Sequence, residues 1–111
     1  MEGSRIKDLN FYTVIGWMLN ILELKGNELI VFAIIYSFSQ DAISEFTGSI
    51  KYLQDFGNIK SHNTVLAVLG NLVEKKYILK RDYEKDRVHR VAYRVNPEII
   101  EKYCSIKPNN R

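Results

Sequence analysis

Basic side chains are concentrated in one short stretch of the chain. Residues 80–94 contain six Lys or Arg residues and three acidic residues. Such a stretch can bind a nucleic-acid backbone, because Lys and Arg pair with phosphate oxygens. The candidate phosphate ligands are Lys80, Arg81, Lys85, Arg87 and Arg90. The alternative is that alternating charges on an exposed strand only prevent edge-to-edge pairing between chains.

The charge of the whole chain is uneven in the same direction. The formal net charge is +3, but residues 1–56 carry −3 and residues 57–111 carry +6. A polyanion is attracted to the second half and weakly repelled by the first. We therefore expect double-stranded DNA as a partner, although an ordinary solvated surface explains the charge equally well.

A helix with two unlike sides is predicted just before the basic stretch. We assign one broad side to the core: Val65, Leu66, Val68, Leu69, Leu72 and Val73. The other side is small and polar, and Asn or Thr there can contact adenine, a thymine methyl or a phosphate. The candidate DNA ligands of this segment are Lys60, Ser61, His62, Asn63, Thr64, Ala67 and Asn71.

The same small side leaves a protein partner open. There is no Lys or Arg between Ser61 and Glu74, whereas a DNA-reading helix usually begins with basic residues. Gly70 in mid-helix costs about 1 kcal/mol relative to Ala, which indicates close packing against DNA or against another protein helix. Separately, the apolar helix expected over residues 9–24 would form a homodimer with a second copy of the chain. Tyr12, Trp17 and Met18 are candidates for a homodimer seam, or they simply cover the core.

Catalytic and metal-binding patterns are not found in the sequence. The single cysteine, Cys104, excludes an internal disulfide and a Cys-rich zinc site. There is no Gly-rich phosphate loop, and His62 and His89 lie far apart in the chain. We expect no enzymatic activity and no cofactor. The longest apolar run, residues 29–36, is too short to span a bilayer, and no signal peptide is visible. We therefore expect a cytoplasmic protein without a membrane partner.

Four helical segments are expected before the basic stretch, over residues 9–24, 28–39, 50–56 and 62–76. Residues 28–39 are apolar on nearly every face, which predicts a central, buried helix. Gly26 is expected to end the first helix and Asn27 to cap the second, while Ser49 and Ser61 cap the next two. Phe46 is expected to anchor the preceding loop in the core.

The turn and the C-terminal elements follow from equally local signals. Gly57 and Asn58 predict a helix end and a turn, which Ile59 would pin to the core. Alternating runs over residues 78–82 and 88–95, joined by a polar tip at residues 84–87, predict an antiparallel hairpin. Pro97 is suited to begin a short helix over residues 98–103.

Three segments resemble a known family. They are Leu-Lys-Gly and the apolar run after it (residues 24–40), Phe-Thr-Gly-Ser and the turn of helix after it (residues 46–53), and Leu-Val-Glu-Lys-Lys-Tyr-Ile (residues 72–78). They are similar to short winged helix-turn-helix proteins of phages, plasmids and other bacterial mobile elements, and to N-terminal domains of phage replication initiators and replisome organisers.

The order of the expected elements predicts a fold that is mainly α with a small β-hairpin (α+β), in the layout of a winged helix-turn-helix, and the resemblance implies the same fold. It would occupy residues 9–103 as one domain, between a flexible start (residues 1–8) and a flexible tail (residues 104–111). The implied function is DNA binding in transcriptional regulation or replication initiation. The family usually has two basic residues where this chain has His62 and Asn63. We therefore expect phosphate contacts by the hairpin to dominate over base reading.

Overall fold

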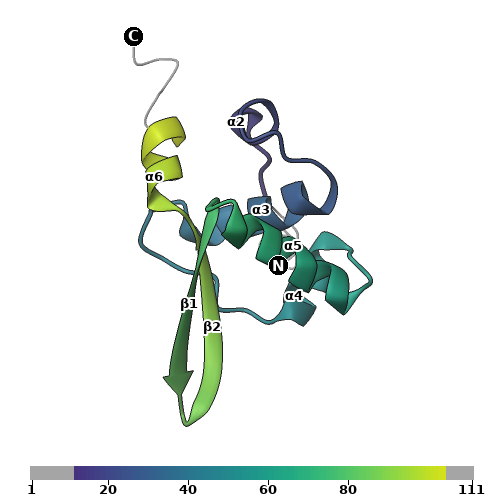
Figure 1. The fold of residues 1–111 in the computed structure, drawn as a ribbon, viewed down its shortest axis with the longest axis vertical. Coiled ribbons are helices and arrows are strands. Elements are labelled where there is room, and N and C mark those ends of the chain that lie inside the picture. The colour runs from purple at the N-terminus through teal and green to yellow at the C-terminus, as the bar shows by residue number, and fades with distance from the viewer. Residues whose placement is uncertain (1–11, 105–111) are drawn as a thin grey trace, which may run out of the picture.

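The computed structural model describes residues 12–104, and Figure 1 shows its α+β architecture. Four helices, α2 (Gly16–Asn20), α3 (Gly26–Ser39), α4 (Ile50–Gly57) and α5 (His62–Glu74), precede strands β1 (Ile78–Lys85) and β2 (Val88–Val95). A last turn of helix, α6 (Pro97–Ile99), continues as a π-helix, η1 (Ile100–Cys104). The α+β expectation is confirmed. The flexible segments predicted at both ends lie, apart from Cys104, outside the described residues.

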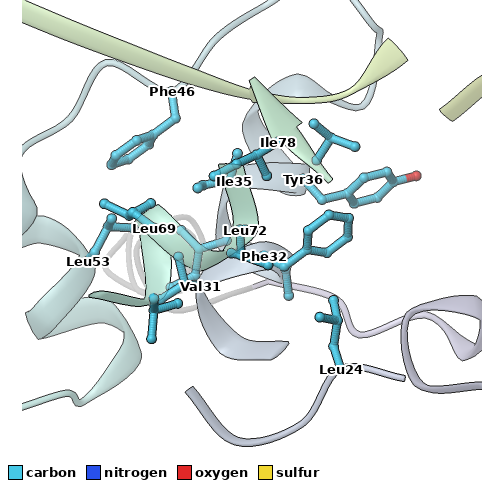
Figure 2. Packing of buried hydrophobic residues seen from close by; sticks show 14 of the residues in the cluster. Leu24, Val31, Phe32, Ile35, Tyr36, Phe46, Leu53, Leu69, Leu72 and Ile78 are labelled. Carbon is cyan, nitrogen blue, oxygen red and sulfur yellow. The ribbon is translucent and has the colours of Figure 1, made fainter. Parts of the chain in front are cut away.

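Helix α3 is the centre of the core, as its sequence predicts. Every residue from 31 to 36 is buried. Figure 2 shows Phe32 and Ile35 of α3 surrounded by side chains from the other elements, including Leu53 of α4, Leu72 of α5 and Ile78 of β1. A helix that is apolar on all faces needs neighbours on several sides, and α4, α5 and β2 supply them here. No helix within residues 12–104 is long and apolar enough to cross a membrane.

The prediction of one helix over residues 9–24 is wrong for most of residues 12–24, the part of it that the structure describes. Only α2 is helical, and Ile15 before it is extended. The N–H groups of Ile21 and Leu22 both donate to the Trp17 carbonyl, each over 3.1 Å, which closes the short helix. The chain then turns so that Leu22 and Leu24 enter the core, which a continuous helix would not allow.

The predicted start of the second helix is also wrong. Helix α3 begins at Gly26, with Lys25 in the N-cap position and no side-chain cap. Gly26 has a φ of +61°, a left-handed conformation that suits glycine, so the chain reverses there and helix follows immediately. Asn27 consequently lies inside α3 and does not cap it.

The segment from α4 to α5 forms as predicted. The Ser49 hydroxyl accepts from the N–H of Tyr52 and the Ser61 hydroxyl accepts from the N–H of Thr64, over 3.0 and 3.2 Å. Asn58 ends α4 in the left-handed conformation, and Ile59 is buried behind it. Helix α5 ends at Glu74, two residues before the predicted end.

The predicted hairpin exists, but its tip is shorter than expected. Eight residue pairs join the strands, from Ile78–Val95 to Lys85–Val88, so residues 84 and 85 belong to β1 and not to the tip. The turn consists of Asp86 and Arg87, which have φ values of 56° and 66° as in a type I′ turn. This turn type matches the twist of two paired strands and permits a two-residue connection.

The loop between α3 and α4 covers the other edge of β2. Phe46 and Tyr93 exchange two backbone hydrogen bonds, over 2.6 Å and 3.0 Å. The Phe46 ring is buried, which confirms its predicted role as an anchor. At the base of the hairpin β2 is therefore paired along both of its edges, while the distal half of the hairpin projects beyond the helices (Figure 1).

The C-terminal helix begins one residue earlier than predicted, at Pro97. The Asn96 side chain caps it by accepting from the N–H of Glu98. After one turn the helix widens to a π-helix. The Tyr103 ring then stacks on Trp17, with ring centroids 5.6 Å apart and planes at 26°.

Candidate nucleic-acid interface

The side chains predicted to read DNA share the exposed face of α5 and the turn before it. Asn63, Ala67 and Asn71 are exposed, as are Lys60, Ser61 and His62, whereas Thr64 is half-buried. The Ser61 hydroxyl is occupied as the helix cap. The structure therefore brings the predicted helix residues together on one surface.

Leu66 also lies on this surface, and its predicted place in the core is wrong. Its exposed fraction is 45%, whereas Val65 is fully buried and Leu69 nearly so. The buried residues of α5 are Val65, Val68, Leu69 and Leu72, which is the spacing of a single helical stripe. Leu66 follows Val65 directly, so its side chain is rotated about 100° around the helix axis and lies beyond the edge of that stripe.

A groove separates α5 from the hairpin, and Leu66 lines it. The groove, which we call the α5–hairpin groove, consists of two hollows of about 400 and 210 Å³ that share Leu66, Lys80 and Tyr93 as lining residues. Burial and the charge of Asp82 raise the pKa of the Tyr93 phenol. Gly70 faces open space, since nothing lies within 4 Å of the position that a Cβ would occupy.

Four Lys and Arg side chains of the hairpin are exposed and are not neutralised by an ion pair within residues 12–104. They are Lys80, Lys85, Arg87 and Arg90.

Two other hairpin cations are bound to the body of the protein. Arg81 forms a two-point ion pair with Glu45 and lies over the Tyr83 ring, 4.8 Å from its centroid. The Arg81 hydrogen bond lowers the pKa of the Glu45 carboxyl and raises the pKa of Arg81 itself. Arg94 donates to the carbonyl of Ala42. Sequence reasoning placed Arg81 among the phosphate ligands and could not foresee a partner 36 residues away.

The two faces of the hairpin differ in charge. Directly paired residues in a β-ladder lie on the same face. The pairing places Tyr83 with Arg90 and Lys85 with Val88 on one face, which also carries Arg81. Asp82 and Glu84 lie on the opposite face with Lys80, and the Asp82 carboxylate contacts His89 Nε2 over 2.9 Å. One face is therefore basic and the other mixed.

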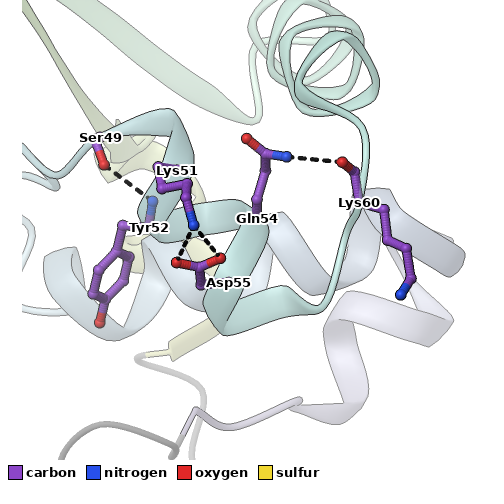
Figure 3. Close-up of polar contacts among 6 residues, drawn as sticks. All are labelled: Ser49, Lys51, Tyr52, Gln54, Asp55 and Lys60. Atoms are coloured by element: carbon purple, nitrogen blue, oxygen red, sulfur yellow. Dashed lines mark hydrogen bonds and ion pairs between the residues drawn. The ribbon is translucent and has the colours of Figure 1, made fainter.

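One hydrogen bond from α4 holds the turn before α5, and a second polar contact lies within α4 itself (Figure 3). Gln54 Nε2 donates to the Lys60 carbonyl over 3.0 Å, which fixes the turn. Lys51 binds both carboxylate oxygens of Asp55, each over 2.9 Å, so its charge is matched locally. The Lys60 side chain points away from this pair (Figure 3).

The residues proposed for a dimer seam pack on their own chain. Met18 is fully buried. Trp17 contacts Phe32 and Tyr36 edge-on, at centroid distances of 5.9 and 5.6 Å, and Tyr12 meets the Phe56 ring. Of the two alternatives, the structure supports the one in which these side chains cover the core.

Residues 12–104 contain no group of three or more His, Cys, Asp or Glu side chains that could hold a metal ion. The α5–hairpin groove is bordered by two exposed cations, Lys80 and Arg90. Comparison of the chain with protein-family models, with curated proteins and with solved structures finds no match.

Proposed function

We propose that this chain is a winged helix-turn-helix protein that binds double-stranded DNA. Helices α4 and α5 and the turn between them form the helix-turn-helix, and the β1–β2 hairpin is the wing. The element order and the two serine caps support this assignment. A role in transcriptional regulation or replication initiation of a mobile element would follow from the family resemblance described above.

One observation carries the proposal. Lys80, Lys85, Arg87 and Arg90 take part in none of the ion pairs formed within residues 12–104, whereas Arg81 is neutralised by Glu45. The base of the hairpin borders α5 across the groove, and its distal half projects beyond the helices (Figure 1). Unpaired cations on a projecting element are available for phosphates without losing internal contacts. If each neutralises one phosphate, a plot of log K against log salt concentration has a slope of about −3.6.

The test is a salt titration of binding to a fluorescent duplex of mixed sequence, followed by anisotropy. Exchanging Arg87 and Arg90 for Ala together should weaken binding to all sequences and bring the slope to about −1.8. Lys25→Ala is the matched control, since it removes an exposed cation outside the hairpin and should leave the slope unchanged. Absence of binding to any duplex at low salt would overturn the proposal.

A protein partner is the second candidate, and the charge pattern favours it in one respect. Asp82 and Glu84 share the hairpin face of Lys80, and Glu74 ends the exposed face of α5, so acidic groups interrupt the basic surface there. A second copy seated on α5 would bury Leu66. A dimer in light scattering that Leu66→Asp dissociates, and Leu19→Asp does not, would favour this candidate. A monomer at high concentration would count against it.

A further inference from the structure

The exposed face of α5 has a restricted chemistry in its first two turns. Asn63, Leu66 and Ala67 are exposed there and offer one amide and two apolar side chains. The first acidic residue of α5 is Glu74, at its far end, and the helix contains no Lys or Arg. The exposed leucine is the part of this pattern that sequence reasoning assigned to the core.

Each base pair in the major groove favours particular side chains. Guanine is read by Arg or Lys, and cytosine by Asp or Glu, all of which are missing from these turns. Adenine is read by Asn or Gln, and the thymine methyl is contacted by apolar side chains. His62 does not alter this comparison, because its imidazole can donate to N7 of either purine.

We propose that α5 reads A·T base pairs in the major groove, with Asn63 hydrogen-bonding adenine and Leu66 packing on the thymine methyl. This inference rests on the proposed DNA-binding function and adds the class of sequence that the protein prefers. The position of Leu66 supports it, since the side chain lines the α5–hairpin groove and is 45% exposed. Lys80 and Arg90, the two cations that line the same groove, would hold the duplex against this face.

Four alternating duplexes separate the contributions to binding. The dA·dU duplex differs from dA·dT only by the thymine methyl. The dI·dC duplex has the major-groove pattern of G·C but lacks the guanine amino group, so its minor groove resembles that of A·T. We expect dA·dT to bind about fourfold more tightly than dA·dU for each methyl that Leu66 covers. Both should bind more tightly than dG·dC and dI·dC, which should bind alike.

Variants assign the two contacts. Leu66→Ala should remove the difference in affinity between dA·dT and dA·dU. Leu19→Ala is the matched control, because Leu19 is exposed to 46% and belongs to α2. Asn63→Ala should remove the preference for dA·dU over dG·dC. The comparison of duplexes with the unaltered protein tests the inference even if a variant does not fold.

Three results would overturn the inference. Equal binding of dA·dT and dA·dU would exclude the methyl contact. Binding of dI·dC as tightly as dA·dT would show that any A·T preference comes from the minor groove. An unchanged dA·dT to dA·dU ratio in folded Leu66→Ala would exclude Leu66. In each case the duplexes still bind, so these failures differ from failure of the proposed function, in which no duplex binds.

Discussion

Arg81 and Glu45 join the hairpin to the loop between α3 and α4 by a two-point ion pair. Nε of Arg81 donates to Oε2 of Glu45 over 2.9 Å, and Nη2 donates to Oε1 over 2.7 Å. A planar guanidinium matches a carboxylate in this geometry, which fixes orientation as well as distance. The pair braces the hairpin near the Phe46–Tyr93 backbone bridge and neutralises one of the exposed hairpin cations.

If the chain binds DNA as proposed, releasing Arg81 should change the salt dependence of that binding. In Glu45→Gln the guanidinium loses its charged partner and becomes available to a further phosphate. We expect the salt slope to steepen by about 0.9. The measurement is the anisotropy titration described above. Glu23→Gln removes the same charge from an exposed side chain elsewhere and serves as the control. An equal change in both variants would mean that net charge alone is responsible.

Two glycines of the α4–α5 segment should respond oppositely to alanine. A Cβ at Gly57 would lie 2.9 Å from Cγ2 of Ile30, at a buried position, so Gly57→Ala should cost about 1–3 kcal/mol in the free energy of unfolding. A Cβ at Gly70 meets nothing within 4 Å. Gly70→Ala should stabilise the protein by up to about 1 kcal/mol, because alanine favours the helix. Urea unfolding of the two variants measures both effects, and equal signs would contradict this account of the packing.

The Ser61 cap should matter for stability more than its exposed position suggests. Its hydroxyl satisfies the N–H of Thr64 at the start of α5. We expect Ser61→Ala to lower the free energy of unfolding by about 1 kcal/mol. Ser61→Asp should lower it much less, because aspartate also caps a helix. Chemical denaturation measures the difference. If Ser61→Ala and Ser61→Asp destabilise equally, the hydroxyl contributes little as a cap.

Acid should weaken the loop between α3 and α4. Hydrogen bonds from the N–H groups of Ser44 and Ile43 lower the pKa of Asp41 from 3.8 to about 2, and the Arg81 hydrogen bond lowers the pKa of Glu45. A carboxyl with a lower pKa in the folded state binds fewer protons there than in the unfolded state. Its stabilisation is therefore complete above its ordinary pKa and is lost as the pH falls through the folded value.

The measurement is denaturant unfolding at a series of pH values from 5.5 downward, with stability expected to fall between about pH 4.5 and 2. The double variant Asp41→Asn, Glu45→Gln should show a shallower dependence, because both titrating groups are gone. An identical pH profile in the double variant would place the acid sensitivity in other carboxyl groups.

Local signals account for the parts of the fold that were predicted correctly. Ser49 and Ser61 cap the helices that follow them, because a cap is made within three residues. The burial of α3 follows from a composition that leaves no polar face. The hairpin follows from alternation, and only its tip differs, since strand pairing continued as far as a two-residue turn allowed.

The errors concern features that depend on distant neighbours. Leu66 is as apolar as Leu69, yet it is exposed and Leu69 is buried. The apolar periodicity of α5 does not show how much of its apolar side the neighbouring elements cover. Arg81 and Arg90 both belong to the basic stretch, and the sequence does not distinguish them. Only the fold brings Glu45 next to Arg81. The start of the chain was assigned from helical spacing, whereas the burial of Leu22 and Leu24 requires an early turn. The sequence thus predicts which residues share the exposed surface of α5, but not the exposure of Leu66 or the Arg81–Glu45 pair.

At Arg87, in the hairpin turn, a stable backbone conformation and a positive side chain favour different residues. Arg87 has a φ of 66°, a conformation that glycine adopts freely and a residue with a Cβ adopts at a cost of about 1 kcal/mol or more. Glycine there would give a firmer hairpin with a blunt, uncharged end. Arginine gives a strained turn that carries a positive charge at the tip of the hairpin. Selection for thermal stability alone should therefore replace Arg87 with glycine early. If Arg87 is retained under such selection, the strain of the turn is not what limits the stability of the protein.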